Sequence, residues 1–388
     1  MSRSRTTYPV RAAIAALTAA LFAVACTSGK RPDAPPAAAA TVAAKADPVA
    51  SVNAIADRYV AAVMDFDPTI TYPTGVPVAS HDRLPRNSKA EIAAAEAVED
   101  TLIADLDRVD AAALRGTPAA ATYAVLREQL DAARGLRVCH AERWSINHMG
   151  GWQVSLPEAA ASQPVDTPQA RDEAIRRWAS LPQYLDNDMA NLREGLATGY
   201  AVPKAIVARV VRQLDGALAA KAEQWPFFSP AERSDDAAFK TRMRETIDGA
   251  IRPAVQRYRD FLANEYAPKA RDGMALSDLP DGAACYAAQL RLYTTLPRSP
   301  QAVYDLGRKT VADYLATIDA KLIAPHAVGE GFTAVDAFLL VFYRWGNIIG
   351  IDMRTAYPNY ARFAEGLGLS ASVMKTLQAE GVRLEGAT

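Results

Sequence analysis

The sequence predicts an all-α fold, an irregular array of many helices with a short extended segment near residues 137–153 and a small helical appendage at the C-terminus. Three observations predict it. Alanine is abundant and only 21 of the 388 residues are glycine, which favours helices. Apolar residues recur at helical spacing from residue 48 onward. No run of alternating β-branched residues is long enough to indicate a sheet.

The composition excludes several classes of protein. Lysine and arginine number 43 against 44 acidic residues, so the chain lacks the basic excess of a nucleic-acid-binding protein, and we expect no nucleic-acid partner. With 4 His and 3 Cys, zinc ribbons and disulfide-rich miniproteins are excluded as well. The composition is therefore that of an ordinary globular protein.

The N-terminus is typical of an exported protein. Arg3, Arg5 and Arg11 precede an uncharged apolar run, residues 12–25, that is too short to span a bilayer core of about 30 Å. The run ends in Ala-Val-Ala-Cys26, which resembles a bacterial lipobox. We therefore predict a signal peptide over residues 1–25 and lipidation of Cys26. The alternative is an ordinary secretory signal in which the cysteine is incidental.

A proline- and alanine-rich segment, residues 26–47, follows and is predicted to be a disordered tether. The expected location is the periplasm, with the membrane as a partner through the lipid anchor. We expect the outer membrane because Thr27 rather than Asp follows the cysteine. Export to an oxidising compartment predicts a disulfide between the two remaining cysteines, Cys139 and Cys285. The alternative is two separately buried thiols.

The first helices of the body have recognisable ends. An amphipathic helix is expected from Pro48 to Asp67-Pro68, where the pattern breaks. Ser88 precedes Glu91 by three residues, the spacing of a capping box, and predicts the start of a second helix. Thr117-Pro118 predicts the start of a third, which ends near Gly135.

The extended segment at residues 137–153 comes next, and further helices follow it. Thr167-Pro168 predicts a helix start, with a bend at Pro182 before the helix continues to Leu196. The remaining predicted helices are residues 203–224, 236–266, 282–293 and 299–322.

No complete catalytic motif is present, so we predict no catalytic residue, no metal ligand and no cofactor. The four His residues include no pair at the i, i+4 spacing of a zinc peptidase, and there is no nucleophile elbow or phosphate-binding loop. The best candidates for substrate binding gather around a Gly-Gly turn: Trp144, Asn147, His148 and Trp152. The alternative, which we favour, is that the tryptophans pack in the core and His148 caps a turn.

Four separate stretches of the sequence together resemble a known family. They are Trp144–Trp152, Leu192-Arg-Glu-Gly195, Pro280-Asp-Gly282 and Val303–Gly307. They resemble the N-terminal part of the bacterial secreted and lipoprotein family called domain of unknown function 885, over about residues 48–315. The resemblance implies a helical zinc peptidase of the gluzincin type, whose His-Glu-x-x-Pro-Gly-His-His element lies in the C-terminal half. This sequence lacks that element.

A second resemblance covers about residues 316–382 and defines a separate C-terminal segment, residues 316–388. It lies in Phe332–Trp345 and Tyr357-Pro-Asn-Tyr360, which resemble the C-terminal helical domain of glutathione S-transferases. Thr333 and Asp336 are spaced to cap a helix. The following residues are apolar on most sides and predict a buried core helix: Phe338, Leu339, Val341, Phe342 and Trp345. The glutathione-binding domain of that family has no counterpart here.

The sequence therefore predicts an envelope lipoprotein that derives from a zinc metallopeptidase family but is catalytically inactive, with a peptide as the candidate ligand. One alternative is a peptidase-like hydrolase with an unrecognised site, and a lesser one is a glutathione S-transferase-like protein. The junction near residues 315–325 is interpreted as a gene rearrangement or frameshift, with a genuine fusion as the alternative.

Overall fold

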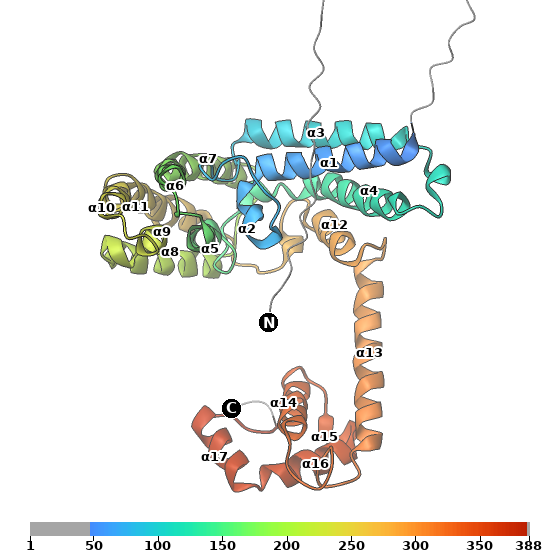
Figure 1. The fold of residues 1–388 in the computed structure, drawn as a ribbon. Helices are drawn as coiled ribbons and strands as arrows, with labels where there is room; N and C mark the ends of the chain where they lie inside the picture. Colours follow the sequence, from blue (N-terminus) through green and yellow to red (C-terminus); the bar gives the residue numbers. More distant parts are fainter. Residues whose placement is uncertain (1–46, 386–388) are drawn as a thin grey trace, which may run out of the picture. The chain divides into compact units, whose positions relative to one another are not determined.

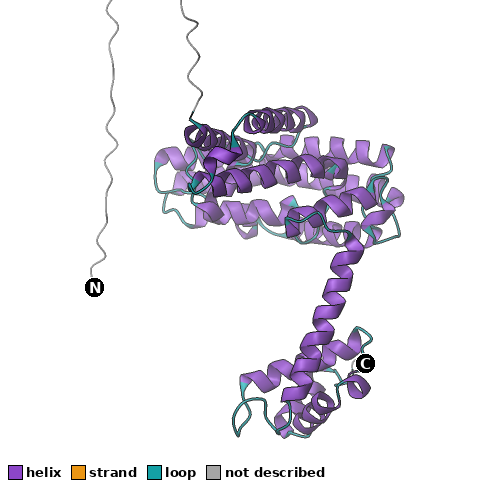
Figure 2. Ribbon diagram, turned by 90° about the vertical axis from the view of Figure 1, so that its right-hand side faces the viewer, coloured by secondary structure: helices purple, strands orange, loops and turns teal. Residues whose placement is uncertain are grey.

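The fold is all-α, as predicted (Figures 1 and 2). It is seen in a computed structural model that describes residues 47–385. Over this range there is no β-strand, and a lone parallel bridge joins Pro203 to Arg271. None of the helices in the same range combines the length and the apolar character needed to cross a membrane. The predicted signal peptide, Cys26 and most of the tether lie outside the described residues.

The first long helices pack side by side around a small core. They are α1 (Pro48–Phe66), α3 (Lys89–Asp107) and α4 (Ala119–Leu136), with the short α2 (Thr71–Thr74) between the first two in the chain. Ile55, Leu106 and Leu130 meet in this core. The side chain of Ser88 accepts the Glu91 amide while Glu91 accepts the Ser88 amide, so the predicted capping box is confirmed.

The largest core lies among the middle helices. These are α5 (Trp152–Ser162), α6 (Pro168–Ala179), α7 (Leu181–Ala197), α8 (Lys204–Ala219), α9 (Ser229–Glu232), α10 (Ala237–Thr246) and α11 (Arg252–Asp260). Two π-helical segments, Ile247–Ile251 and Phe261–Tyr266, lie on either side of α11 in one continuous helical run. Such segments are rare and concentrate near functional sites.

A disulfide connects α12 (Gly282–Thr294) to the turn that follows α4. The Sγ atoms of Cys139 and Cys285 are 2.15 Å apart and the Cα atoms 4.7 Å apart. Both cysteines are buried, and α12 packs against α4.

The C-terminal helices have a core of their own. They are α13 (Pro300–Lys321), α14 (Ala334–Ile348), α15 (Met353–Ala356), α16 (Pro358–Gly368) and α17 (Ala371–Glu380). Leu315 and Leu322, at the end of α13, belong to this core together with Tyr360. The boundary expected at residues 315 and 316 therefore falls inside a continuous helix.

The extended segment predicted at residues 137–153 is wrong. The chain forms 3₁₀ turns at Arg137–Cys139 and Ala141–Trp144, and α5 begins at Trp152. His140 between the turns has a φ of 44°, and the indole of Trp144 donates to the carbonyl of Cys139 at 2.7 Å. No strand lies beside this segment within the described range, so its backbone groups bond locally instead.

The buried role predicted for α14 is also wrong for most of its apolar residues. Phe338 is 63% exposed and Trp345 is 52% exposed. The helix packs on α16 through another face, which carries Leu340 and Tyr343. α14 is therefore hydrophobic on most of its sides, although only one face of the helix is buried by other segments.

Candidate functional site

The turn before α5 is built around Asn147. Its side-chain Oδ1 accepts the amide N–H groups of Met149 at 2.8 Å and Gly150 at 3.2 Å. Its main-chain carbonyl accepts the amide of Gly151 at 3.1 Å. A Cβ on Gly151 would lie 2.4 Å from that carbonyl oxygen, so only glycine fits. Asn147 thus uses its polar atoms to shape the turn.

His148 is held against α8. Nη1 of Arg209 lies 3.0 Å from Nε2 of His148, and the amide of Gln213 donates to the His148 carbonyl at 2.8 Å. A guanidinium only donates, so Nε2 of His148 accepts in this contact. Nε2 of His148 is therefore already engaged by Arg209, and His148 does not line the pocket described next.

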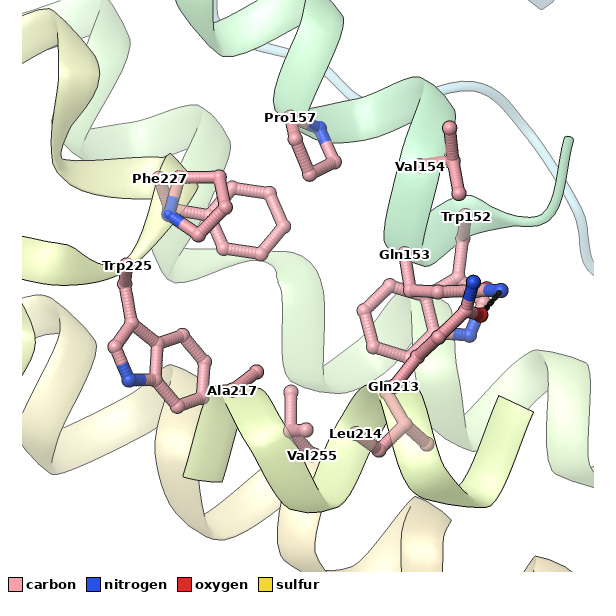
Figure 3. A pocket seen from close by; sticks show the side chains of 11 residues that line it. Trp152, Gln153, Val154, Pro157, Gln213, Leu214, Ala217, Trp225, Phe227 and Val255 are labelled. Carbon is pink, nitrogen blue, oxygen red and sulfur yellow. Dashed lines mark hydrogen bonds between the residues drawn. The ribbon is translucent and has the colours of Figure 1, made fainter. Parts of the chain in front are cut away.

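Trp152, at the start of α5, lines a pocket of about 150 Å³ (Figure 3). Trp225 and Phe227 lie on the opposite side, and α8 forms the floor with Leu214 and Ala217. The full lining is Trp152, Gln153, Val154, Pro157, Gln213, Leu214, Ala217, Trp225, Pro226, Phe227 and Val255. It is apolar and aromatic except for two glutamines.

The two glutamines form the polar edge of the pocket. Nε2 of Gln153 donates to Oε1 of Gln213 at 3.0 Å and also to the carbonyl of Asn147 at 2.7 Å. Figure 3 shows this pair beside Trp152. The lining contains no nucleophile and no acid–base side chain.

A buried hydrogen-bonded group lies behind Trp152. The ring of Tyr258 meets Trp152 edge-on, with centroids 5.4 Å apart and planes at 90°. Its hydroxyl donates to Asp188 at 2.6 Å, and the Ser145 hydroxyl donates to the other oxygen at 2.7 Å. Burial raises the pKa of Asp188, although both hydrogen bonds oppose the shift. Burial also raises the pKa of Tyr258, and Asp188 adds to that effect.

The four residues predicted to bind substrate lie close together around one turn, but they have different structural roles. Only Trp152 lines the pocket. Asn147 and His148 fix the turn, and Trp144 closes the preceding 3₁₀ turn through its indole N–H.

Sequence reasoning missed most of the pocket. Gln213 comes from α8 and Val255 from α11, and neither is close to Trp152 in the chain. The run Trp225-Pro-Phe-Phe228 is a signal that could have been followed, because three of its four residues are aromatic, a density that recurs in this chain only at residues 342–345.

No metal-binding group was found in the described part of the chain. Residues 47–385 contain no cluster of three or more His, Cys, Asp or Glu side chains able to hold a metal ion.

A solved structure is similar to this chain in its fold. A crystal structure of "the putative lipoprotein from Colwellia psychrerythraea" matches with a TM-score of 0.61 at 15% sequence identity. The match covers 76% of this chain and 54% of that protein, so this chain spans about half the length of its structural relative. At this identity the likeness concerns the fold alone. No curated protein matches the chain.

A family match covers most of the sequence. The family described as bacterial protein of unknown function, DUF885, matches residues 68–339. The matched range runs through α13 and into α14, beyond the residue 315 at which the resemblance was expected to end. Because the match exceeds half of the 388 residues, the chain belongs to the DUF885 family.

Proposed function

We propose that this chain is an envelope lipoprotein that binds an apolar or aromatic side chain of a peptide in the Trp152 pocket without hydrolysing the peptide. The observation that carries the proposal is the pocket of about 150 Å³ between Trp152, Trp225 and Phe227, with a glutamine pair at its edge.

The size of the pocket favours a single side chain. A cavity of about 150 Å³ with apolar walls accommodates a molecule the size of benzene. Pockets for whole small molecules measure roughly 300–1,000 Å³. Gln153 Nε2 is used by Gln213 and Asn147, but the Oε1 of Gln153 can still accept and the second N–H of Gln213 can still donate, which suits the main chain of a bound peptide.

The absence of hydrolysis is inferred from the chemistry of the lining and of its surroundings. No lining residue can act as a nucleophile or a general base. Nε2 of His148 is bound to Arg209, and Asp188 is buried behind Tyr258. Descent from a zinc peptidase is part of the same proposal.

A pocket-filling substitution tests the proposal. The probes are blocked tripeptides, Ala-Phe-Ala and Ala-Ala-Ala, followed by tryptophan fluorescence. The parent protein should respond to the phenylalanine peptide and not to the alanine peptide. Ala217→Phe should abolish the response because Ala217 lines the pocket. Ala208→Phe is the matched control, since Ala208 is exposed on the same helix.

Two outcomes would contradict the proposal. The binding site is wrong if the phenylalanine peptide gives no response or if Ala217→Phe responds like the parent. Cleavage of the peptide by the purified protein, detected by mass spectrometry and dependent on added zinc, would instead support the alternative of a hydrolase with an unrecognised site.

A further inference from the structure

The C-terminal helices contain a second and larger pocket of about 730 Å³. Pockets of roughly 300–1,000 Å³ are the usual size for small-molecule ligands. It lies between the loop that follows α13 and the residues of α16 and early α17. Its lining is Ile323, Ala324, Pro325, His326, Phe332, Arg362, Phe363, Gly366, Leu367, Leu369, Ser370 and Ser372.

Apolar side chains form most of this lining. Phe363 and Leu367, on α16, are 3% and 4% exposed and belong to the C-terminal core. Ile323, Phe332 and Leu369 line the same pocket, yet they are 78%, 52% and 79% exposed. Exposed apolar side chains that gather around one hollow indicate a surface suited to an apolar ligand.

The one lining residue with a fixed charge is the cation Arg362. Arg362 and His326 line the pocket, and no Asp or Glu does. Nη2 of Arg362 donates to the side chain of Asn359 at 2.7 Å, but within residues 47–385 no carboxylate forms an ion pair with this guanidinium. Arginine has five N–H donors in a planar fork that fits a carboxylate. Most of that capacity is available here.

The carboxyl group nearest to His326 is already occupied. Asp336 accepts the amide of Ala327 at 2.7 Å and both the amide and the hydroxyl of Thr333, at 2.6 and 2.8 Å. Nδ1 of His326 is 3.9 Å from Asp336, too far for a hydrogen bond, and this buried nitrogen has no partner in the described part of the chain. Asp336 therefore holds the loop in place and leaves the imidazole unpaired.

Two serine hydroxyl groups complete the polar part of the pocket lining. The Oγ atoms of Ser370 and Ser372 are 2.9 Å apart. Only one of the two protons is used between them, so the other can be donated to an acceptor in the pocket.

We propose that this pocket binds an amphipathic carboxylic acid in its ionised form. The carboxylate head would pair with Arg362 and accept the hydroxyl proton of the serine pair. The aliphatic or aromatic body would cover Ile323, Phe332 and Phe363. The apolar walls select the body, and the purely cationic charge of the lining selects the head.

Calorimetry with the full-length protein tests the proposal, with dodecanoate as probe and dodecanol as its uncharged match. The parent should bind dodecanoate more tightly than dodecanol. Arg362→Gln should weaken dodecanoate binding about tenfold and leave dodecanol binding unchanged, because one charge-assisted interaction is lost. Arg354→Gln is the matched control, since Arg354 is exposed on neighbouring α15, pairs with Glu365 and does not line the pocket.

A second variant tests the place of binding. A Cβ on Gly366 would meet no atom within 4 Å, so Gly366→Leu fits the backbone and projects into the pocket that Gly366 lines. It should abolish binding of both probes, whereas Ala217→Phe in the other pocket should change neither. The proposal is wrong if dodecanoate does not bind, if dodecanol binds equally well, or if Arg362→Gln or Gly366→Leu behaves like the parent.

Discussion

The hydroxyl of Tyr258 donates a 2.6 Å hydrogen bond to the carboxyl group of Asp188, and both side chains are buried. This bond connects α11 to α7 directly behind the pocket, because the Tyr258 ring packs against Trp152. Ser145 binds the second oxygen of Asp188. The indole that lines the pocket is therefore positioned by a buried polar group rather than by apolar packing alone.

Loss of this hydrogen bond should destabilise the protein. Tyr258→Phe keeps the ring against Trp152 but leaves Asp188 with only the Ser145 hydroxyl as a side-chain partner. A buried group deprived of its partner costs about 1–3 kcal/mol. We expect a lower free energy of unfolding in urea. Tyr286→Phe, at a half-exposed site, is the control and should unfold like the parent.

Asp188 should also make stability depend on pH. Burial raises its pKa above the ordinary value of 3.8, so folding takes up a proton between the unfolded and the folded pKa. The contribution of the protonated group is present at low pH and is lost as pH rises through the folded pKa. Asp188→Asn cannot titrate. The stability of the parent relative to this variant should therefore fall as the pH rises above the ordinary pKa of 3.8, measured by urea unfolding, and a constant difference would contradict the expectation.

Short-range signals predicted the helices well. The capping box of Ser88 and Glu91 acts within one turn, and Thr167 caps α6 as its position before Pro168 suggested. The prediction of an extended segment was wrong because the chain forms 3₁₀ turns there. The indole of Trp144 donates to the carbonyl of Cys139 across these turns, a local hydrogen bond that apolar spacing does not reveal. Whether the apolar residues of a helix such as α14 are buried depends on which other segments pack against the helix, and Phe338 remains 63% exposed.

The candidate site was predictable only in part, because its residues meet through the fold. Trp152 stood out beside the Gly-Gly turn, but Gln213 and Trp225 reach the pocket from other segments. Asp188 was not among the predicted site residues, because its burial follows from the contact between α7 and α11 rather than from the local sequence.

The disulfide between Cys139 and Cys285 should form in the exported protein. Thiol titration in denaturant without reductant should find neither thiol free, and both should appear after reduction. The loop between them spans 146 residues. For such a loop the chain-entropy treatment gives about 4–5 kcal/mol before strain, so the double serine variant should unfold at much lower denaturant. Two reactive thiols in the oxidised, denatured protein would show that the disulfide does not form.

Lipidation of Cys26 should decide where the protein resides. Bacterial lipoproteins carry several acyl chains, which bind a membrane far more firmly than one chain does. We expect the parent in the outer-membrane fraction and Cys26→Ser in the soluble fraction or retained as an uncleaved precursor of higher mass. An unchanged membrane fraction with a normally processed N-terminus would support the alternative of a secretory signal with an incidental cysteine.

Gly195 should be the least replaceable glycine on the helices near the site. A Cβ added there would lie 2.0 Å from the carbonyl oxygen of Arg143, which belongs to the 3₁₀ turn packed on α7. Backbone cannot move aside as a side chain can, so Gly195→Ala should separate α7 from this turn. The expected loss is about 1–3 kcal/mol in urea unfolding, as for overpacking in a core.

Gly216 on α8 is the matched control for Gly195. A Cβ at Gly216 would meet nothing within 4 Å, and its backbone is helical. Alanine at such a position stabilises a helix by roughly 0.5–1 kcal/mol because the unfolded chain loses freedom. The two Gly→Ala variants should therefore change the free energy of unfolding in opposite directions. If both stabilise the protein, the close approach of the Arg143 carbonyl to α7 does not exist in solution.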